Sequence, residues 1–466
     1  MKLTFVGGAR KVTGSMHLLE VNRTRVLLDC GLTHGHRGEA YQTNVEQAAL
    51  GAHADALVLS HAHIDHSGNI PTLAKQGFTG DIWSTSATRD LCAAMLRDSA
   101  HLQAEDAAFL NKRRRAHGEP PVEPLYGRAD ADACMGLFVG INYGRSFSVA
   151  DGVRVTFLDA GHILGSALTL LELQEKGRRL RLGYTGDLGR ADLPILRDPE
   201  QLQDVDYLIM ESTYGGRPGQ SPDEARMILK RVINETYARG GKVIVPAFAV
   251  GRTQEIVYDL YVLRQERKVP DIPVYVDSPL AVDATEIFRL HPECYDREMA
   301  EILERDQFGP LGHSQVRYVR RVDDSKELNF LREPAVIISA SGMAEGGRIL
   351  HHLKNNLGDE RNTVLFVGYQ AENTLGRRIQ DGASEARIFD DVYPVRARVE
   401  SVQGYSAHAD HDGLVAHAER AARSGRLRGI FLVHGEDDAS LALSEALKQR
   451  GLPGVTVPKP SEEVTL

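Results

Sequence analysis

The stretch "DALVLSHAHIDHSGNIP", residues 55–71, contains three histidines and an aspartate within six positions: His61, His63, Asp65 and His66. A hydrophobic core would have to satisfy every one of these polar groups, and an ordinary surface loop has no need of such a density. Neutral imidazole and carboxylate are common metal ligands. Because the apolar run "DALVL" precedes the cluster, the stretch predicts a buried strand that leads directly into a metal site.

The spacing within this cluster suits two metal ions. Residues two apart in an extended segment project to the same side, so His61 and His63 can hold one ion together. Asp65 and His66 follow where the segment turns into a helix, and they can reach a second ion close by. A ligand set without thiolate suits Zn²⁺ and leaves Mn²⁺ or Fe open. We therefore expect two Zn²⁺ ions per chain.

Other apolar runs end in the same way. "TRVLLDCG" leads to Asp29, "VRVTFLDAGH" to His162, "RLRLGYTGD" to Asp187, "VDYLIMES" to Glu211 and "GIFLVHGE" to His434. Each run predicts a buried strand that delivers a histidine or a carboxylate at its C-terminal end, where functional sites collect in α/β proteins.

These strand-end residues can complete the two metal sites. We expect His162 to complete the first site and His434 the second, and Asp187 to bridge them, because a carboxylate has two oxygens. Asp29 is better suited to accept a hydrogen bond from a ligand histidine and so to fix its tautomer. Two ions held in this way form a clamp for hydrolysis at phosphorus or at a carbonyl, with a bridging hydroxide as the nucleophile.

The organisation of the chain indicates an inserted domain. A length of 466 residues predicts two domains. Residues 205–395 alternate strand and helix, which predicts an α/β block with its own parallel sheet. Residues 396–466 return to the strand-end histidines of the first part. We therefore expect domain segments at 1–204, 205–395 and 396–466, with the middle segment inserted into the domain formed by the other two.

Charge and cysteine usage limit the partners and the compartment. The net charge of −9 argues against a uniformly basic coat for nucleic acid but allows a local basic cleft. The four cysteines form no CxxC pair, which is typical of proteins in a reducing compartment. No stretch approaches the ~20 apolar residues of a membrane span, and the N-terminal apolar stretch is too short for a signal peptide. We expect a cytoplasmic protein without membrane association and leave a homodimer open.

In combination, these motifs resemble a known family. The cluster at 61–66, His162 in "GHILGS" and Asp187 in "TGDLGR" resemble the metallo-β-lactamase superfamily. The inserted block resembles the β-CASP domain of RNA-processing nucleases, a group that includes the endonuclease subunit of the cleavage and polyadenylation machinery. The resemblance covers essentially the whole chain. It implies an αββα sandwich with an inserted β-CASP α/β domain.

The resemblance also implies catalytic roles. Glu211 in "MESTYG", His408 in "YSAHAD" and His434 in "LVHGE" match the family motifs A, B and C. The family scheme implies that His408, oriented by Glu211, protonates the leaving oxygen, and Asp65 counts both as a ligand and as a catalytic residue. A histidine in motif C is typical of members that act on RNA, so His434 favours RNA over DNA.

The inserted block offers candidate contacts to substrate phosphates. "SASGM" places Ser341 and Gly342 after a strand, where backbone N–H groups can cradle a phosphate. Arg252 and Arg377 follow glycines at strand-to-helix junctions, where a guanidinium group can clamp a phosphate. We expect these four residues to bind the RNA backbone.

The function that these features predict is metal-dependent, endonucleolytic hydrolysis of single-stranded RNA. The sequence shows neither the extra C-terminal domain of ribonuclease J nor the KH modules of archaeal relatives, which favours a compact enzyme of the bacterial style. One alternative is a small-molecule hydrolase of esters, thioesters or lactones, which needs neither the large insert nor the Glu211–His408 pair. The other is a non-catalytic RNA-binding subunit, which the complete set of candidate ligands disfavours.

Overall fold

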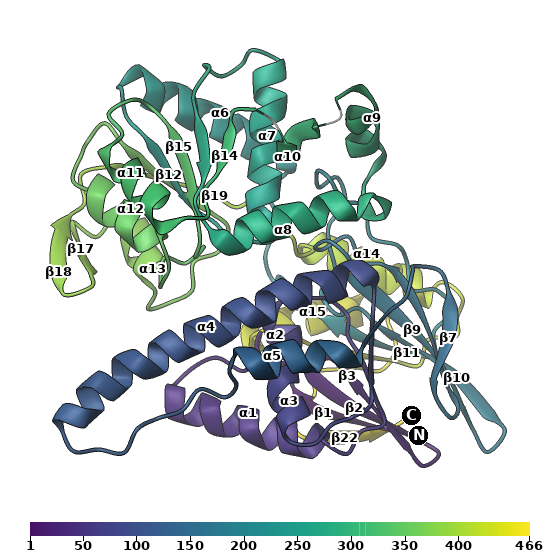
Figure 1. The fold of residues 1–466 in the computed structure, drawn as a ribbon. Helices are drawn as coiled ribbons and strands as arrows, with labels where there is room; N and C mark the ends of the chain where they lie inside the picture. Colours follow the sequence, from purple (N-terminus) through teal and green to yellow (C-terminus); the bar gives the residue numbers. More distant parts are fainter. Residues whose placement is uncertain (307, 313) are drawn as a thin grey trace. The chain divides into compact units, whose positions relative to one another are not determined.

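The computed structural model describes residues 1–306, 308–312 and 314–466, and it divides into two compact units (Figure 1). Unit 1 comprises residues 1–191, 198–218 and 408–466, and unit 2 comprises residues 192–197 and 219–407. Unit 2 is thus an insertion into unit 1, as the sequence predicts.

Unit 1 is built on two seven-stranded sheets. The first has the order β22-β1-β2-β3-β4-β5-β6, with strands Lys2–Gly7 (β1), Met16–Val21 (β2), Thr24–Leu28 (β3), Ala56–Val58 (β4), Asp81–Ser84 (β5), Phe138–Gly140 (β6) and Glu462–Thr465 (β22). The second has the order β21-β20-β11-β10-β9-β8-β7, with strands Ser146–Ala150 (β7), Val153–Asp159 (β8), Ala167–Glu175 (β9), Arg178–Tyr184 (β10), Tyr207–Glu211 (β11), Gly429–Val433 (β20) and Val455–Thr456 (β21).

The two sheets pack face to face around one hydrophobic core. Leu3, Phe5 and Leu19 from the first sheet share this cluster with Phe157 and Leu171 from the second, and all five side chains are fully buried. The side chains of β8 alternate in burial: Val153, Val155 and Phe157 face the core, while the residues between them are more exposed. Because successive side chains of a strand point to opposite faces, one face of each sheet contributes its side chains to the shared core.

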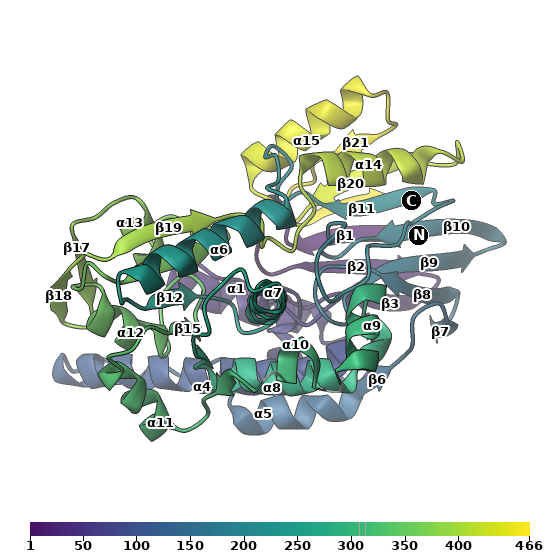
Figure 2. The ribbon, with the colours of Figure 1, turned by 90° about the horizontal axis from the view of Figure 1, so that it is seen from above.

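Helices cover the outer faces, with α14 and α15 on one side of the sheets and α4 and α5 on the other (Figure 2). Apolar residues of α14 and α15 form a second buried cluster with the outer face of β11 and β20. The αββα order that the sequence predicts is therefore confirmed. The helices of unit 1 are Arg37–Gly51 (α1), Ile64–Ser67 (α2), Ile70–Lys75 (α3), Ser86–Ala116 (α4), Arg128–Cys134 (α5), His411–Ala422 (α14) and Asp437–Gln449 (α15).

Unit 2 contains a six-stranded, fully parallel sheet in the order β14-β13-β15-β12-β16-β19. A parallel sheet within this segment was predicted and is confirmed. Its strands are Val243–Pro246 (β12), Val274–Val276 (β13), Val316–Tyr318 (β14), Val336–Ser339 (β15), Thr363–Val367 (β16) and Arg398–Val402 (β19). Glu385–Ile388 (β17) and Asp391–Pro394 (β18) form a separate antiparallel hairpin.

Eight α-helices surround this sheet within the described residues of unit 2. The first of them begins with a capping box: the Ser221 side chain accepts a hydrogen bond from the Glu224 amide, and the Glu224 carboxylate accepts one from the Ser221 amide. The helices are Pro222–Ala238 (α6), Arg252–Gln265 (α7), Pro279–Leu290 (α8), Arg297–Arg305 (α9), Gly309–Gly312 (α10), Val322–Glu327 (α11), Ile349–Asn356 (α12) and Leu375–Gln380 (α13).

The unit boundaries differ from the predicted segments 1–204, 205–395 and 396–466. Strand β11 lies beyond the predicted first boundary, yet it pairs with β10 and β20 of unit 1. Strand β19 lies beyond the predicted second boundary, yet it extends the sheet of unit 2 by pairing with β16. Both strands are only five residues long, and their hydrogen-bonded neighbours decide to which sheet each belongs.

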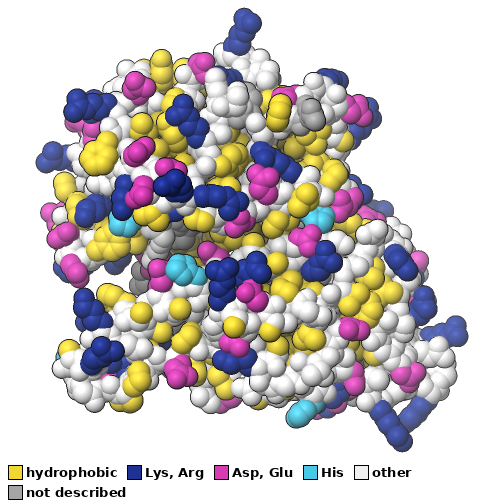
Figure 3. Space-filling view, in the orientation of Figure 1, with side chains coloured by type: hydrophobic (Ala, Val, Ile, Leu, Met, Phe, Trp, Pro, Cys, Tyr) yellow, Lys and Arg dark blue, Asp and Glu magenta, His cyan; other side chains and the backbone are white. Residues whose placement is uncertain are grey.

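On the face shown in Figure 3, Lys and Arg side chains are interspersed with Asp and Glu side chains. Among the described residues, no helix has both the length and the apolar character that crossing a membrane requires.

Candidate metal and catalytic centre

The candidate site residues lie at or just after the ends of strands of unit 1, and three of them stand at the same distance from a strand end. β4 ends at Val58, β8 at Asp159 and β10 at Tyr184, and His61, His162 and Asp187 each follow three residues later. His434 comes directly after β20, Asp29 directly after β3, and Glu211 is the last residue of β11. The six strands predicted from apolar runs are therefore present and end where the sequence indicated.

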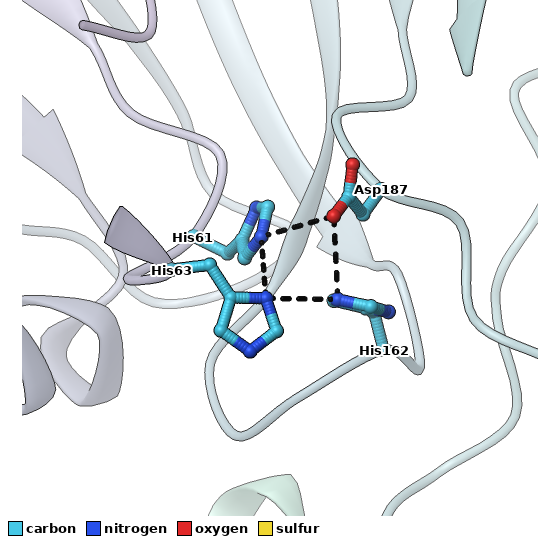
Figure 4. A group of neighbouring side chains, drawn as sticks. All are labelled: His61, His63, His162 and Asp187. Atoms are coloured by element: carbon cyan, nitrogen blue, oxygen red, sulfur yellow. Dashed lines mark hydrogen bonds and ion pairs between the residues drawn. The ribbon is translucent and has the colours of Figure 1, made fainter. Parts of the chain in front are cut away.

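The first cluster consists of His61, His63, His162 and Asp187, whose side chains point toward a common centre (Figure 4). His63 Nδ1 lies 3.2 Å from His61 Nε2 and 3.2 Å from His162 Nε2. Asp187 Oδ2 lies 3.3 Å from His61 Nε2 and 3.4 Å from His162 Nε2. The four atoms thus form a closed ring of nearly equal separations.

This ring has the size that a zinc ion requires. Whether the ring is folded into a tetrahedron or lies flat, its centre is about 2.0–2.3 Å from each of the four atoms, close to the usual Zn–N and Zn–O bond lengths of ~2.0–2.2 Å. The donor set of three imidazoles and one carboxylate is also one that zinc accepts. The residues therefore fit a metal ion on both distance and chemistry.

The second cluster consists of Asp65, His66 and His434. His434 Nε2 lies 3.5 Å from Asp65 Oδ2. Asp187 Oδ1 lies 3.1 Å from both His66 Nε2 and His434 Nδ1. The Oδ2 atom of Asp187 thus faces the first cluster while its Oδ1 atom faces the second. His66 Nε2, Asp187 Oδ1 and His434 Nε2 are buried without a hydrogen-bond partner, as expected of atoms that ligate an ion.

Burial keeps the histidines of the first cluster in the form that binds metal. It lowers the pKa of His63 to about 3, and it also lowers the pKa of His61 and of His162, because an imidazolium ion is poorly solvated there. A neutral imidazole has the free lone pair that a metal ion needs. These three side chains are therefore ready to ligate at neutral pH.

Asp29 holds two of the ligand histidines in their tautomers. Its carboxylate accepts hydrogen bonds from His66 Nδ1 (2.6 Å), Tyr184 Oη (2.6 Å), Ser60 Oγ (2.7 Å) and the Ser60 amide (2.7 Å). Because Ser60 Oγ donates its proton to Asp29, it accepts from His61 Nδ1, 3.0 Å away. Both rings therefore carry a proton on Nδ1 and turn Nε2 toward Asp187, and Nε2 is the unprotonated nitrogen when the ring is neutral.

His66 can also carry a second proton, on Nε2. Burial alone would lower the pKa of His66, but the negative charges of Asp187 and Asp29 outweigh it and raise the pKa well above its ordinary value. The proton on Nε2 must leave before that atom can bind a metal ion. Metal binding at His66 is therefore coupled to proton release.

His408 and Glu211 form a pair beside the first cluster. His408 Nδ1 donates to the fully buried Glu211 carboxylate, with distances of 3.1 Å to Oε1 and 3.0 Å to Oε2, and His408 Nε2 lies 3.9 Å from Asp187 Oδ2. Burial lowers the pKa of His408, but the charges of Glu211 and Asp187 outweigh it and raise the pKa to about 9. The backbone amide of Leu188 donates to Glu211 Oε1 and helps to fix the carboxylate.

The sequence did not single out every residue of this centre. It missed Ser60 and Tyr184, which position Asp29, and Thr213, whose Oγ1 lies 3.3 Å from His434 Nδ1. The Tyr214 ring also packs edge-on against His408, with centroids 5.9 Å apart. Their only sequence signal is adjacency, since each stands within three residues of a predicted site residue.

The residues predicted to bind phosphate lie in unit 2, and their side chains have partners there. Arg252 Nη1 pairs with Glu255 Oε2 at 3.1 Å, and Arg377 Nε pairs with Asp381 at 2.8–2.9 Å. Ser341 Oγ accepts a hydrogen bond from the Glu345 amide. Gly342 lies in the same loop, against the ring of Phe248.

Comparison with known families assigns the chain along most of its length. A beta-lactamase superfamily domain matches residues 24–223, a Beta-Casp domain matches residues 253–379, and a Zn-dependent metallo-hydrolase RNA specificity domain matches residues 392–458. The chain belongs to the β-CASP family of the metallo-β-lactamase superfamily. A member of this family is a metal-dependent hydrolase, which agrees with the clusters of ligands described above.

Named relatives support this assignment, and two of them have nearly the same length as this chain. The chain is 35% identical to the ribonuclease TTHA0252 of Thermus thermophilus, over 97% of both chains. It is 32% identical to an RNase J-like protein of Methanocaldococcus jannaschii, over 95% of this chain and 94% of that one. It is also 32% identical to the transcription termination factor FttA of the same organism, over 96% of this chain and 69% of that one.

A solved structure shares the fold at much lower identity. A protein of unknown function from Enterococcus faecalis superposes with a TM-score of 0.55 and 12% identity, over the full length of this chain and 99% of that one. This likeness concerns the fold alone.

Proposed function

We propose that the protein is an endonucleolytic ribonuclease that hydrolyses phosphodiester bonds of single-stranded RNA with two Zn²⁺ ions. The observation that carries this proposal is the division of Asp187 between two ligand clusters, with the His408–Glu211 pair beside them. A two-ion clamp suits displacement at phosphorus, and a protonated histidine suits the departure of an alkoxide. The names of the relatives, which are RNA nucleases or a factor acting in transcription, support RNA as the substrate.

The chain supplies a full set of ligands for two ions. His61, His63, His162 and Asp187 Oδ2 would hold the first ion, and Asp65, His66, His434 and Asp187 Oδ1 would hold the second. When bound, the ions would polarise the scissile phosphate and lower the pKa of water, so that hydroxide is available as the nucleophile near neutral pH. Asp29, through His66 and Ser60, keeps the ligand imidazoles in the required tautomers.

His408 acts as the general acid in this proposal. Its Nδ1 is engaged by Glu211, so the proton available to a substrate is the one on Nε2, on the side of the ring that faces Asp187. With a pKa of about 9, the ring is protonated at neutral pH. It can therefore give that proton to the leaving oxygen, and the Glu211 carboxylate stabilises the charged ring until transfer.

The alternatives fit these contacts less well. A small-molecule hydrolase of esters, thioesters or lactones needs neither the inserted domain nor the His408–Glu211 pair. A non-catalytic RNA-binding subunit would not need the ligand set to converge at metal–ligand distances. His434 lies in the second cluster, and its identity as histidine supports RNA rather than DNA through the family resemblance.

The compartment is proposed from the cysteines. All four, Cys30, Cys92, Cys134 and Cys294, are buried and unbridged. Free buried thiols are typical of proteins in a reducing compartment. We therefore propose that the enzyme works in the cytoplasm.

A cleavage assay tests the proposed function. Purified protein is incubated with 5′-labelled and with circular single-stranded RNA, with and without a chelator, beside the variants His408→Ala and His101→Ala. His101 is an exposed histidine of α4 and serves as the matched control. We expect the wild type and His101→Ala to cut both RNAs, and His408→Ala or chelator to stop cleavage. Failure to cut the circular RNA would refute endonucleolysis, and full activity of His408→Ala would remove this residue from the mechanism.

A further inference from the structure

We propose that Phe248 and Tyr369 of unit 2 form a platform on which unpaired RNA bases stack. This inference rests on the proposed function and adds a base-binding site for which unit 2 alone supplies the residues.

Both aromatic residues leave the same edge of the parallel sheet. β12 and β16 are neighbours, with Ile244 opposite Val364. Phe248 stands two residues after the end of β12, and Tyr369 stands two residues after the end of β16. The carboxyl edge of a parallel α/β sheet is where ligands are bound in many folds, because loops rather than strands line it.

Gly342, in the loop after β15, joins the two aromatic loops. A Cβ atom at position 342 would lie 3.1 and 3.2 Å from two carbons of the Phe248 ring, so the ring packs directly against glycine backbone. The Gln370 side chain, next in sequence to Tyr369, donates from Nε2 to the Gly342 carbonyl (3.0 Å) and to the Tyr369 carbonyl (3.2 Å). The loops after β12, β15 and β16 therefore meet at one point.

The backbone beneath Phe248 is held firmly, while both aromatic side chains keep a large exposed area. The Phe248 carbonyl accepts from Thr253 Oγ1 at 2.7 Å, and the Ala247 amide donates to the Ser339 carbonyl at 3.1 Å. Phe248 is nevertheless 44% exposed and Tyr369 40% exposed. A ring with one face packed on a fixed backbone and the other face in solvent loses little freedom when a flat ligand stacks on it.

The chemistry of this edge favours bases rather than phosphates. The two arginines predicted to clamp phosphate are paired with Glu255 and Asp381, so the surface offers rings more readily than free positive charge. Every nucleobase has a π face, so stacking on an aromatic side chain tolerates any sequence. Binding of this kind suits an enzyme that acts on single-stranded RNA, in which bases are unpaired.

Equilibrium binding tests the platform. Full-length holoprotein carrying His408→Ala, which prevents cleavage of the probe, is titrated with a fluorescent unstructured RNA and with an abasic oligoribonucleotide of equal length. We expect tighter binding of the RNA, and Phe248→Ala or Tyr369→Ala should each raise its Kd about tenfold and leave the abasic probe unaffected. The slope of log Kd against log salt should stay the same in these variants, because no phosphate contact is lost.

Two further variants make the outcome decisive. Phe248→Trp should preserve binding, whereas Phe330→Ala, at an 82% exposed aromatic elsewhere in unit 2, should have no effect. Unchanged RNA affinity in both alanine variants, with an unchanged thermal unfolding midpoint, would overturn the platform even if the enzyme cleaves RNA. Equal weakening of the RNA and abasic probes would also overturn it. Absence of RNA cleavage by the wild type would instead refute the proposed function.

Discussion

The strand-end regions of the two units use the same architectural position for different chemistry. In unit 1, the residues that follow the strands are buried histidines and carboxylates that face one another at 3.1–3.5 Å. In unit 2, the corresponding edge carries the half-exposed rings of Phe248 and Tyr369, and the two arginines predicted to bind phosphate are paired with Glu255 and Asp381. The first region is built to hold ions and a proton, and the second to contact a flat ligand. Substitutions in unit 1 should therefore cost activity far more than substitutions in unit 2.

The largest effect is expected at Asp187, since its two oxygens serve both clusters. We expect Asp187→Ala to reduce bound zinc from two ions per chain to fewer than one, and cleavage by about 10³-fold or more. Elemental analysis and single-turnover cleavage measure the two effects. Asp381→Ala, which removes an exposed carboxylate of unit 2, is the control. If the Asp187→Ala variant still bound two ions, Asp187 would not serve both clusters, and the contrast drawn between the two units would be wrong.

The next effect concerns the protonation of His408. We expect His408→Ala to lower cleavage by about 10²–10⁴-fold with zinc content unchanged. Because the acid is active while protonated, wild-type activity should fall on the alkaline side, as the pH rises through the raised pKa of His408. Glu211→Gln removes a charge that raises this pKa, so the alkaline limb of the pH–rate profile should move to lower pH. An unmoved limb would show that His408 is not the titrating acid.

A smaller effect is expected from Asp29, which does not reach the metal ions. Asp29→Asn should weaken zinc binding by about 10–100-fold, because the tautomers of His61 and His66 are no longer fixed. Zinc affinity of the wild type should also fall as the pH is lowered, since the raised pKa of His66 means that protons compete for Nε2. Competition with a fluorescent chelator at several pH values measures both effects. Wild-type affinity in Asp29→Asn would show that the carboxylate is dispensable.

The smallest effect is expected at Arg377, whose charge is already satisfied by Asp381. Arg377→Ala should raise the KM for RNA by no more than about threefold, because an exposed ion pair is weak and contributes little to its surroundings. Steady-state cleavage of a short RNA measures this change. A rise of tenfold or more would show that Arg377 exchanges Asp381 for a substrate phosphate, and it would support the phosphate clamp that the sequence predicts.

Much of the fold and of the candidate centre could be predicted from local sequence. The six strands that deliver the site residues are apolar runs with a polar end, and the density of histidine at 61–66 has no role in ordinary packing. The pairing of Arg252 with Glu255 and of Arg377 with Asp381 could also have been anticipated, since spacings of three and four residues place side chains together on a helix.

Other features depend on contacts between distant segments and could not be predicted. The placement of β11 and β19 is decided by their sheet neighbours, not by their own composition. The network of Ser60, Tyr184 and Asp29 joins residues that are up to 155 positions apart in sequence. Phe248 and Gly342 meet because β12 and β15 are adjacent strands, which neither segment reveals alone.

Anomalous diffraction from crystals of the zinc-loaded protein tests the central claim most directly. The account predicts two zinc peaks about 3.5–4 Å apart, one between His61, His63 and His162 and the other between Asp65, His66 and His434, with one oxygen of Asp187 on each. A single peak, or two peaks that share no ligand at Asp187, would contradict it.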